Sequence, residues 1–295
     1  MLYRKLQTAV ILWRPRMSLL ASDSHSSFPR RIVCLSDEAV EVIYLLGEQD
    51  RIVGVSGFST RPPEIRTKPK VSTFRDADFE AIAGLNPDLL ITYSDVQADI
   101  SREASLRGLA VLNCNQRSLA EIYDTIALLS RMLGKAAEGD RLIAGYQSDL
   151  CEIANSAAKL PYRPRVYFEE WNDPLISGIQ WVEELIEIAG GEPIFPELRA
   201  CRKANDRVVS WQAVIERNPE LIFASWCGMK VKREEITSRP AAERISAVRT
   251  SQIHEIPSSL ILQPGPAALT VGVRIMHEIL SDAAKATRAE SFAGI

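Results

Sequence analysis

One short segment occurs twice in the chain and limits the folds that the chain can adopt. Residues 86–91 read Asn-Pro-Asp-Leu-Leu-Ile, and residues 218–223 read Asn-Pro-Glu-Leu-Ile-Phe. Proline cannot continue a helix and biases the preceding residue toward extended backbone, so each Asn-Pro pair predicts a helix end directly before a buried strand. Arg31 and Arg165, which begin two further apolar runs, are separated by a similar interval. We therefore expect two lobes of similar build. The alternative is a coincidence of one common helix-to-strand junction.

The segments around the first copy alternate between short apolar runs and helical periodicity. This alternation is typical of a parallel sheet with crossover helices. The expected strands are 31–35, 51–56, 88–92 and 109–113, and the expected helices are 38–46, 78–85, 97–107 and 119–133.

The second half shows the same alternation. Its expected strands are 165–168, 220–225 and 253–256, and its expected helices are 181–189, 211–217 and 266–280. The predicted fold class is α/β, with two similar Rossmann-like lobes that each contain a parallel sheet.

A single long helix is expected between the halves. Apolar residues recur at helical spacing at Leu142, Tyr146, Leu150 and Ile153, and prolines follow the segment. Such a helix would join the lobes as a rigid rod, unlike a Gly/Ser linker. The predicted parts are a flexible lead-in 1–30, a lobe 31–134, an interlobe helix 135–160 and a lobe 161–295.

The net charge and the number and spacing of the cysteines argue against several classes of protein. The formal net charge of -3 gives no basic footprint for nucleic acid. The five cysteines are odd in number and none are spaced as C-x-x-C, so we expect thiols in a reducing compartment rather than a disulfide framework or a zinc ribbon. The apolar run 8–13 is short for a signal peptide and is followed by Arg14-Pro15-Arg16. These features predict a cytoplasmic protein.

Several segments, taken in their order along the chain, resemble one protein family. They are Val-Gly-Val-Ser-Gly-Phe at 53–58, Pro-Pro-Glu at 62–64, Val-Ser-Thr-Phe at 71–74, Asn-Pro-Asp-Leu-Leu at 86–90, Pro-Leu-Ile-Ser-Gly at 174–178 and Ala-Gly-Gly at 189–191. Over about 31–280 the chain resembles the cobalamin- and siderophore-binding proteins of ABC importers, whose lobes are joined by one long helix. It is most similar to the cobalamin-binding branch.

The resemblance implies a binding protein rather than an enzyme. It implies a corrinoid-like ligand in a cleft between the lobes, no intrinsic cofactor, a monomer, and an ABC permease as partner. It places Glu80 at a permease-docking position of the first lobe, whereas the second lobe has Gln212, which cannot form the ion pair. Family members usually work in the periplasm or at the cell surface, which is the alternative to a cytoplasmic location.

Side chains that follow the expected strands form the candidate ligand site. Ligands bind outside the carboxyl ends of strands in open α/β sheets. The candidates are Ser36, Asp37, Phe58, Phe74 and Tyr93 in the first lobe, and Glu169, Glu170, Trp171, Trp181, Trp226, Cys227 and Gln263 in the second.

Each group of candidates has an alternative role. Tryptophans at a rim suit stacking on a flat ligand, but large aromatics are also core residues. At most one of Glu169 and Glu170 should face a cleft, where it would accept hydrogen bonds from a ligand or hold a metal; a salt-bridged pair is the alternative. Cys227 could ligate a soft metal or pack as a small apolar residue.

Other ligands and one other class of protein are also consistent with the sequence. Haem, an iron–siderophore or an oxyanion would fit the same fold. A metal-dependent enzyme on a two-lobed α/β fold would need convergent cysteine and histidine ligands. The sequence has no HExxH, P-loop or GxSxG motif, and we predict no resident metal site.

Overall fold

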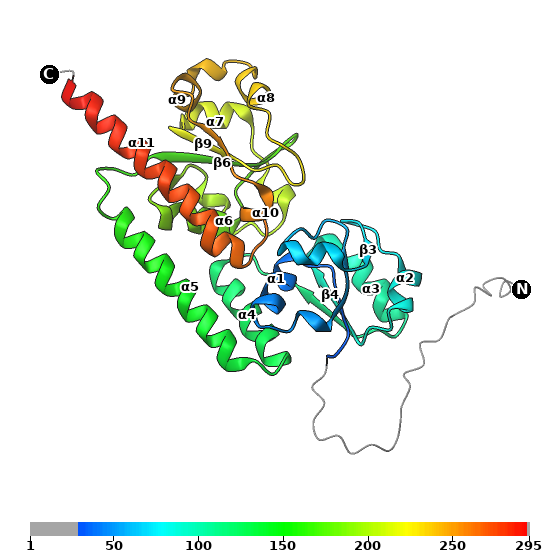
Figure 1. The fold of residues 1–295 in the computed structure, drawn as a ribbon. Helices are drawn as coiled ribbons and strands as arrows, with labels where there is room; N and C mark the ends of the chain where they lie inside the picture. The colour runs from blue at the N-terminus through cyan, green and yellow to red at the C-terminus, as the bar shows by residue number, and fades with distance from the viewer. Residues whose placement is uncertain (1–28, 294–295) are drawn as a thin grey trace, which may run out of the picture. The chain divides into compact units, whose positions relative to one another are not determined.

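The chain folds into two compact units, each built from helices and a sheet. The computed structural model describes residues 29–293, with side chains up to residue 286. Unit 1 contains the described residues up to Gln116 together with Thr125–Gly139, and unit 2 contains Arg117–Asp124 and the residues from Asp140 onward. Figure 1 follows the chain from blue to red through these elements. The predicted α/β class is confirmed, whereas the predicted lead-in 1–30 falls almost entirely outside the described residues.

Unit 1 contains a five-stranded parallel sheet in the order β3-β2-β1-β4-β5. The strands are β1 (Ile32–Cys34), β2 (Ile52–Ser56), β3 (Lys70–Ser72), β4 (Leu89–Tyr93) and β5 (Val111–Cys114). The helices are α1 (Asp37–Leu45), α2 (Phe79–Gly84), α3 (Ala98–Leu106) and α4 (Leu119–Met132), the last of which begins in unit 2. Strand β3 was not predicted, because its three residues show no alternation long enough to recognise.

The central strand of unit 1 is buried on both faces. Ile32, Val33 and Cys34 are all fully buried. Helices α1 and α3 pack against strands β1 and β4, as two-sided covering of a parallel sheet requires. Continuous apolar runs, rather than alternating ones, are the sequence signature of such strands.

Unit 2 contains a mixed sheet in the order β10-β9-β6-β7, with β8 also paired to β6. Its strands are β6 (Arg165–Asn172), β7 (Leu175–Ser177), β8 (Glu192–Pro193), β9 (Leu221–Ala224) and β10 (Ile253–Glu255). Its helices are α6 (Gln180–Ala189), α7 (Trp211–Arg217), α8 (Arg233–Thr237), α9 (Ser246–Arg249), α10 (Ser258–Ile261) and α11 (Val273–Ala293), the last preceded by a π-helical turn, Ala268–Gly272.

One strand of unit 2 departs from the predicted parallel arrangement. Strand β6 does not stop at Phe168 but continues to Asn172, and β7 returns antiparallel to it. The prediction ended β6 early because Glu169 and Glu170 do not look like strand interior. Both carboxylates are paired in the fold, which allows the strand to continue.

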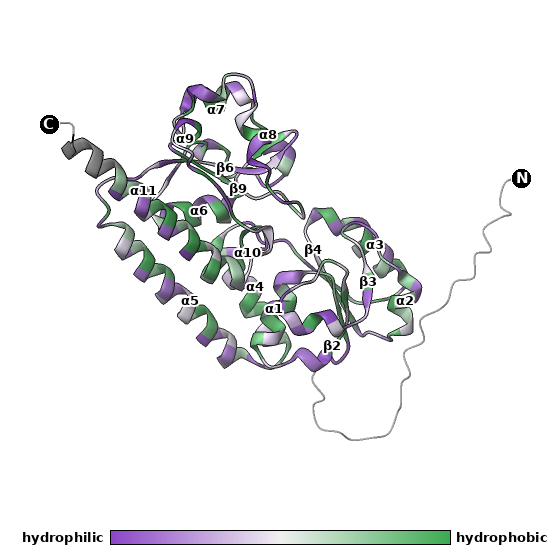
Figure 2. Cartoon of the chain, turned by 45° about the horizontal axis from the view of Figure 1, so that its top comes forward, coloured by the Kyte–Doolittle hydropathy of each residue, from purple (hydrophilic) through white to green (hydrophobic). Residues whose placement is uncertain are grey.

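Helix α5 (Ala136–Ala157) is the long helix expected between the halves. It is unbroken over 22 residues, with its first four residues in unit 1 and the rest in unit 2. Its buried side chains are Tyr146, Leu150, Ile153 and Ala157, which recur at helical spacing. Figure 2 shows the alternating apolar and polar bands of this amphipathic helix.

The two Asn-Pro segments adopt the same backbone conformation. Asn86 has φ +46° and Asn218 has φ +44°, in the left-handed region that asparagine tolerates better than most residues. Each asparagine directly follows the last turn of a helix, α2 or α7, and each proline leads into a strand, β4 or β9. The predicted repeat is therefore present in the fold.

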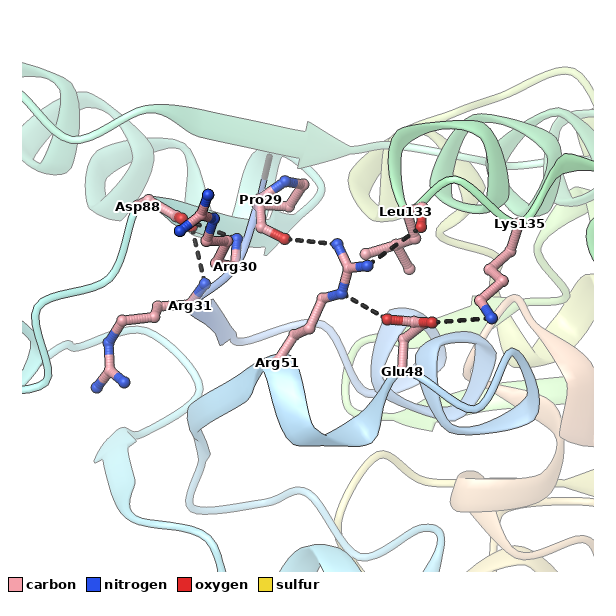
Figure 3. Close-up of polar contacts among 8 residues, drawn as sticks. All are labelled: Pro29, Arg30, Arg31, Glu48, Arg51, Asp88, Leu133 and Lys135. Atoms are coloured by element: carbon pink, nitrogen blue, oxygen red, sulfur yellow. Dashed lines mark hydrogen bonds and ion pairs between the residues drawn. The ribbon is translucent and has the colours of Figure 1, made fainter. Parts of the chain in front are cut away.

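The acidic residue after each proline holds the start of the unit's first strand. In unit 1 the Asp88 carboxylate accepts from the backbone N–H groups of Arg30 (2.8 Å) and Arg31 (3.0 Å), as Figure 3 shows. In unit 2 Glu220 accepts from the N–H of Arg165 (2.9 Å). We refer to Asp88 and Glu220 as the junction carboxylates. They tie two strands that are far apart in sequence.

The arginines beside these contacts reinforce the junctions. The Arg31 guanidinium donates to the carbonyl of Leu85 at the end of α2 (2.6 Å), and Arg165 donates to the carbonyl of Arg217 at the end of α7 (3.1 Å). Each helix end thereby gains a donor for an otherwise unpaired carbonyl.

A second polar cluster in unit 1 joins three segments. Arg51 donates to the carbonyls of Pro29 (2.8 Å) and Leu133 (3.4 Å) and pairs with Glu48. Glu48 also pairs with Lys135 (3.1 Å) at the start of α5 (Figure 3). These ion pairs lower the pKa of Glu48, although its partial burial opposes the shift.

The junction carboxylates give a graded prediction for stability. Asp88→Ala removes two charge-assisted hydrogen bonds, so we expect it to lower the free energy of unfolding by about 2 kcal/mol. Glu220→Ala removes one such hydrogen bond and a long, partly exposed ion pair with Arg165 (3.6 Å) that adds little, and we expect a loss of about 1 kcal/mol. Urea unfolding followed by circular dichroism measures both. Asp99→Ala, an exposed change on α3, is the control. Losses no larger than that of the control would contradict the assigned role.

Candidate functional site

The unit 1 candidates gather at one edge of the sheet. All five strands of unit 1 run parallel, so the loops after β1, β2, β3 and β4 leave from the same edge. Four of the candidates lie at the strand ends or in these loops, namely Ser36, Phe58, Phe74 and Tyr93, and Asp37 is the first residue of α1 after β1.

Ser36 caps helix α1 and is buried beneath this edge. Its hydroxyl accepts from the N–H of Ala39 (3.4 Å) and donates to Glu38 (2.7 Å). Glu38 is itself buried and also accepts from the side-chain amide of Gln116 (3.3 Å). Burial raises the pKa of Glu38 to about 7, against the opposing hydrogen bonds. Ser36 therefore supports the edge from below and offers little surface to a ligand.

Asp37 binds the loop after β2. The hydroxyl of Ser59 donates to its carboxylate, and Lys70 lies near enough to interact with its charge. Burial raises the pKa of Asp37, while Ser59 and Lys70 act in the opposite direction. Lys70 also donates to the carbonyls of Ser59 (3.4 Å) and Ile65 (3.2 Å). These contacts fix the backbone that follows Phe58.

Phe58 and Phe74 form an exposed aromatic pair at this edge. Phe58 is 54% exposed and Phe74 is 44% exposed. Their ring centroids lie 6.4 Å apart with planes at 87°, an edge-to-face arrangement. Phe74 lies in a tight turn closed by the hydrogen bond from Thr73 N–H to Asp76 carbonyl (2.8 Å). Large apolar side chains left exposed on rigid loops are typical of a binding surface.

Tyr93 ends strand β4 and is half-buried. Its N–H donates to the side chain of Gln97 (2.9 Å), and the next residue, Ser94, has φ +57°. The loop therefore turns sharply at the edge where the aromatic pair lies.

The adjacent residues Glu169 and Glu170 of unit 2 each form an ion pair with an arginine. Glu169 is fully buried, pairs with Arg239 at 2.6 and 2.9 Å, and accepts from the indole N–H of Trp226 (3.1 Å). Glu170 pairs with the buried Arg207 at 2.6 and 3.2 Å. Both residues form salt bridges, which was the alternative role. We therefore assign neither carboxylate as an acceptor of hydrogen bonds from a ligand.

Two of the three candidate tryptophans are core residues. Trp181 is 2% exposed and donates from its indole to the carbonyl of Ile261 (2.8 Å), and Trp226 is 1% exposed. The prediction that they would line a rim is wrong, because Trp181 lies on the buried face of α6 and Trp226, although it follows β9, turns into the core. Trp171 is only half-buried and donates to the carbonyl of Asp173 (2.9 Å).

Cys227 and Gln263 keep some exposure. Cys227 is exposed in the loop after β9, and Gln263 is half-buried before the last helix. Cys34 and Cys114 are buried in unit 1, where burial raises the pKa of both thiols.

Glu80 lies on the surface of unit 1. It occupies the first turn of α2, its side chain is 71% exposed, and its contact with Arg107 is long (3.7 Å). Gln212, in the first turn of α7, is also exposed and donates to Glu216 (2.9 Å).

The described residues contain neither a metal-binding cluster nor a helix that could span a membrane. No three His, Cys, Asp or Glu side chains of known position gather as a metal-binding set. None of the helices in the described part of the chain combines the length and apolar character needed to cross a bilayer.

Sequence reasoning missed the buried groups that support these loops. Ser59, Arg207 and Arg239 gave no signal, because their partners are distant in the chain. Glu183 was also missed: it is buried in unit 2, and burial raises its pKa to about 8. The one sequence signal for Glu183 was its position as a charged residue on the otherwise apolar face of α6.

Known proteins match most of the chain. The family model described as periplasmic binding protein matches residues 32–260. A vitamin B12-binding protein of Vibrio parahaemolyticus is 24% identical over 257 residues, covering 85% of this chain and 90% of the relative. An uncharacterized ABC transporter substrate-binding lipoprotein of Bacillus subtilis is 24% identical over 266 residues, covering 87% and 82%. The periplasmic heme-binding protein RhuT from Roseiflexus sp. RS-1 has the same fold, with a TM-score of 0.74, 22% identity, and 86% and 99% covered.

These matches overturn the predicted cytoplasmic location. The similar proteins are described as periplasmic or as lipoproteins, which supports a location outside the cytoplasmic membrane. The prediction rested on the short apolar run 8–13 and on the odd cysteine count. That run lies outside the described residues.

The buried Glu38 predicts a pH-dependent stability. Between pH 4.5, the usual pKa, and about 7 the folded state holds a proton that the unfolded chain releases, so the free energy of unfolding falls as the pH rises. Glu38→Gln keeps an acceptor for Ser36 and Gln116 and removes the charge. We expect the variant to be more stable than the wild type by about 3 kcal/mol at pH 8 and nearly equal at pH 4.

Urea unfolding across pH 4 to 8 measures this difference. Glu64→Gln, at an exposed glutamate of the same unit, is the matched control and should show no such trend. A difference for Glu38→Gln that is the same at every pH would contradict the assignment.

Proposed function

The chain belongs to the periplasmic binding protein family, and on this basis we propose that it is the solute-binding component of an ABC importer whose cargo is a flat metal chelate of the corrinoid or porphyrin type. The relative from Vibrio is named for vitamin B12, so a cobalamin-like corrinoid is the first cargo to test. Haem is the porphyrin to test beside it, and an iron–siderophore or an oxyanion is the alternative cargo. The cargo is bound and released unchanged, without turnover.

The aromatic pair carries this proposal. Phe58 and Phe74 offer an apolar surface that the fold does not use for its own core. The contacts of Ser59, Asp37 and Lys70 hold the Phe58 loop in place before ligand arrives, which lowers the entropy lost on binding. A macrocycle with an extended apolar face is the kind of ligand that two fixed rings can contact.

Titration with cyanocobalamin and with iron protoporphyrin IX tests the cargo class. We expect saturable 1:1 binding of at least one chelate by calorimetry and visible absorbance. Phe58→Ala and Phe74→Ala should each weaken the affinity about tenfold, since each removes the burial of an aromatic ring. Leu106→Ala, at a 68% exposed residue of α3, is the control and should bind normally. Normal binding by both phenylalanine variants would remove this surface from the site.

Glu80 is the proposed contact with the permease. Among the described residues the exposed Glu80 carboxylate has one ion pair, the long contact with Arg107, so it can meet a cation on a partner. We expect Glu80→Gln to bind cargo with an unchanged Kd but to support at most a tenth of the wild-type uptake in cells that carry the native transporter. Asp99→Asn is the control for a surface charge of the same unit. Unchanged uptake by Glu80→Gln would reject the docking role.

A further inference from the structure

A short exposed turn follows strand β3 and carries one ring of the aromatic pair. The turn comprises Thr73, Phe74, Arg75 and Asp76, which are all exposed, and we call it the β3 turn. Its two ends bind each other, through hydrogen bonds from Thr73 N–H to the Asp76 carbonyl (2.8 Å) and from Asp76 N–H to the Thr73 hydroxyl (3.1 Å). These bonds fix the internal shape of the turn, but they do not fix its direction relative to the sheet.

One side chain of unit 1 joins the β3 turn to the rest of the unit. The side-chain amide of Gln97 donates to the Phe74 carbonyl (3.4 Å). Among the described residues, this is the hydrogen bond that links the β3 turn to a distant part of the chain. Gln97 lies at the end of the loop after β4, and β4 is separated from β3 by β2 and β1 in the sheet. The contact therefore crosses the carboxyl edge of the sheet.

Gln97 is buried, and its amide binds two further segments of this edge. Its oxygen accepts from the N–H of Tyr93 at the end of β4 (2.9 Å), and its nitrogen also donates to the carbonyl of Leu35 after β1 (3.5 Å). Both amide hydrogens and the amide oxygen are therefore used. The side chain is 4% exposed, so breaking this set would leave polar groups without water to replace the lost hydrogen bonds. Gln97 thus holds the segments after β1, β3 and β4 in one arrangement.

The hydrogen bond from Gln97 determines the direction of the Phe74 ring. Because the Phe74 carbonyl binds a buried amide, the ring is left exposed on the turn, where it meets Phe58 edge to face. Phe58 is held separately, through the hydrogen bond between Ser59 and Asp37 in the same loop. Each ring of the aromatic pair therefore depends on its own polar contact beneath the edge.

We propose that Gln97 is a positioning residue, which holds the β3 turn and its Phe74 ring in the binding arrangement before a ligand arrives. This inference rests on the proposed function. Gln97 acts without touching the ligand, since its side chain is buried beneath the loops. Without this hydrogen bond the turn would adopt directions in which the two rings do not meet, and fewer encounters with a ligand would be productive. The role of Gln97 should therefore appear in the rate of association.

Hydrogen–deuterium exchange of the unliganded protein tests whether Gln97 holds the turn. Gln97→Met keeps the length of the side chain and removes its hydrogen bonds, and Gln97→Glu keeps the acceptor for Tyr93 N–H and removes at least one donor. In both variants we expect exchange to accelerate about fivefold in peptides that cover residues 73–78 and to stay at the wild-type rate in β1 and β4. Gln147→Met, at an exposed glutamine of α5, is the control. Unchanged exchange at the turn, or equal acceleration throughout unit 1, would overturn the inference.

Binding kinetics separate positioning from a loss of folded protein. The ligand is cyanocobalamin, or iron protoporphyrin IX if that is the chelate that the wild type binds. In stopped-flow experiments Gln97→Met should lower the association rate constant about fivefold and change the dissociation rate constant by less than about twofold. A variant that is only partly folded would instead show fewer binding sites by calorimetry, with wild-type rate constants. That result would overturn the positioning role.

The two measurements distinguish failure of this inference from failure of the proposed function. If the wild type binds neither chelate, the proposed function is rejected, and exchange at the β3 turn then decides whether Gln97 holds it. If the wild type binds a chelate and both Gln97 variants associate at the wild-type rate, the proposed function stands and the positioning role is rejected.

Discussion

The carboxylate that follows each Asn-Pro pair sets the geometry on which both sheets depend. Asp88 and Glu220 each bind the backbone N–H at the start of their unit's first strand. The resulting registers agree, with Ile32 opposite Leu89 in unit 1 and Val166 opposite Leu221 in unit 2. A slip of one residue would turn every side chain to the other face of the sheet. These contacts at the amino ends therefore determine which side chains emerge at the carboxyl ends.

The supporting groups at the carboxyl edges are polar and buried, whereas the exposed groups are apolar or cationic. Glu38 and Asp37 bind Ser36 and Ser59 and hold the loops of unit 1. Glu169 and Arg239 do the same beside Trp226 in unit 2. A buried carboxylate is tolerated only when hydrogen bonds or a cation compensate its desolvation, so these networks are rigid by necessity. A rigid edge suits a protein of a solute-binding family, because it is already in place when the solute arrives.

Local sequence patterns predicted the parts of this fold that local physics determines. Both Asn-Pro junctions and most helices follow from proline geometry and apolar periodicity within about ten residues. The direction of a side chain at a strand end depends instead on partners distant in the sequence. Trp226 turns inward because Glu169 accepts its indole N–H, and nothing near Trp226 in the sequence indicates that contact. Phe58 and Phe74 were predicted as site residues, but their mutual contact across the loops was not.

Whether a cation at the carboxyl edge of a sheet is paired depends on its neighbours in the fold, so the residue type alone does not indicate it. A salt bridge within the fold neutralises a cation, as Glu170 does for Arg207 and Glu41 for Arg61. A cation that the fold leaves unpaired next to an exposed apolar side chain contributes little to folding, because its solvation is unchanged when the chain folds. Among the described residues, Arg75 beside Phe74 and Lys230 beside Met229 share this arrangement in two units of similar build.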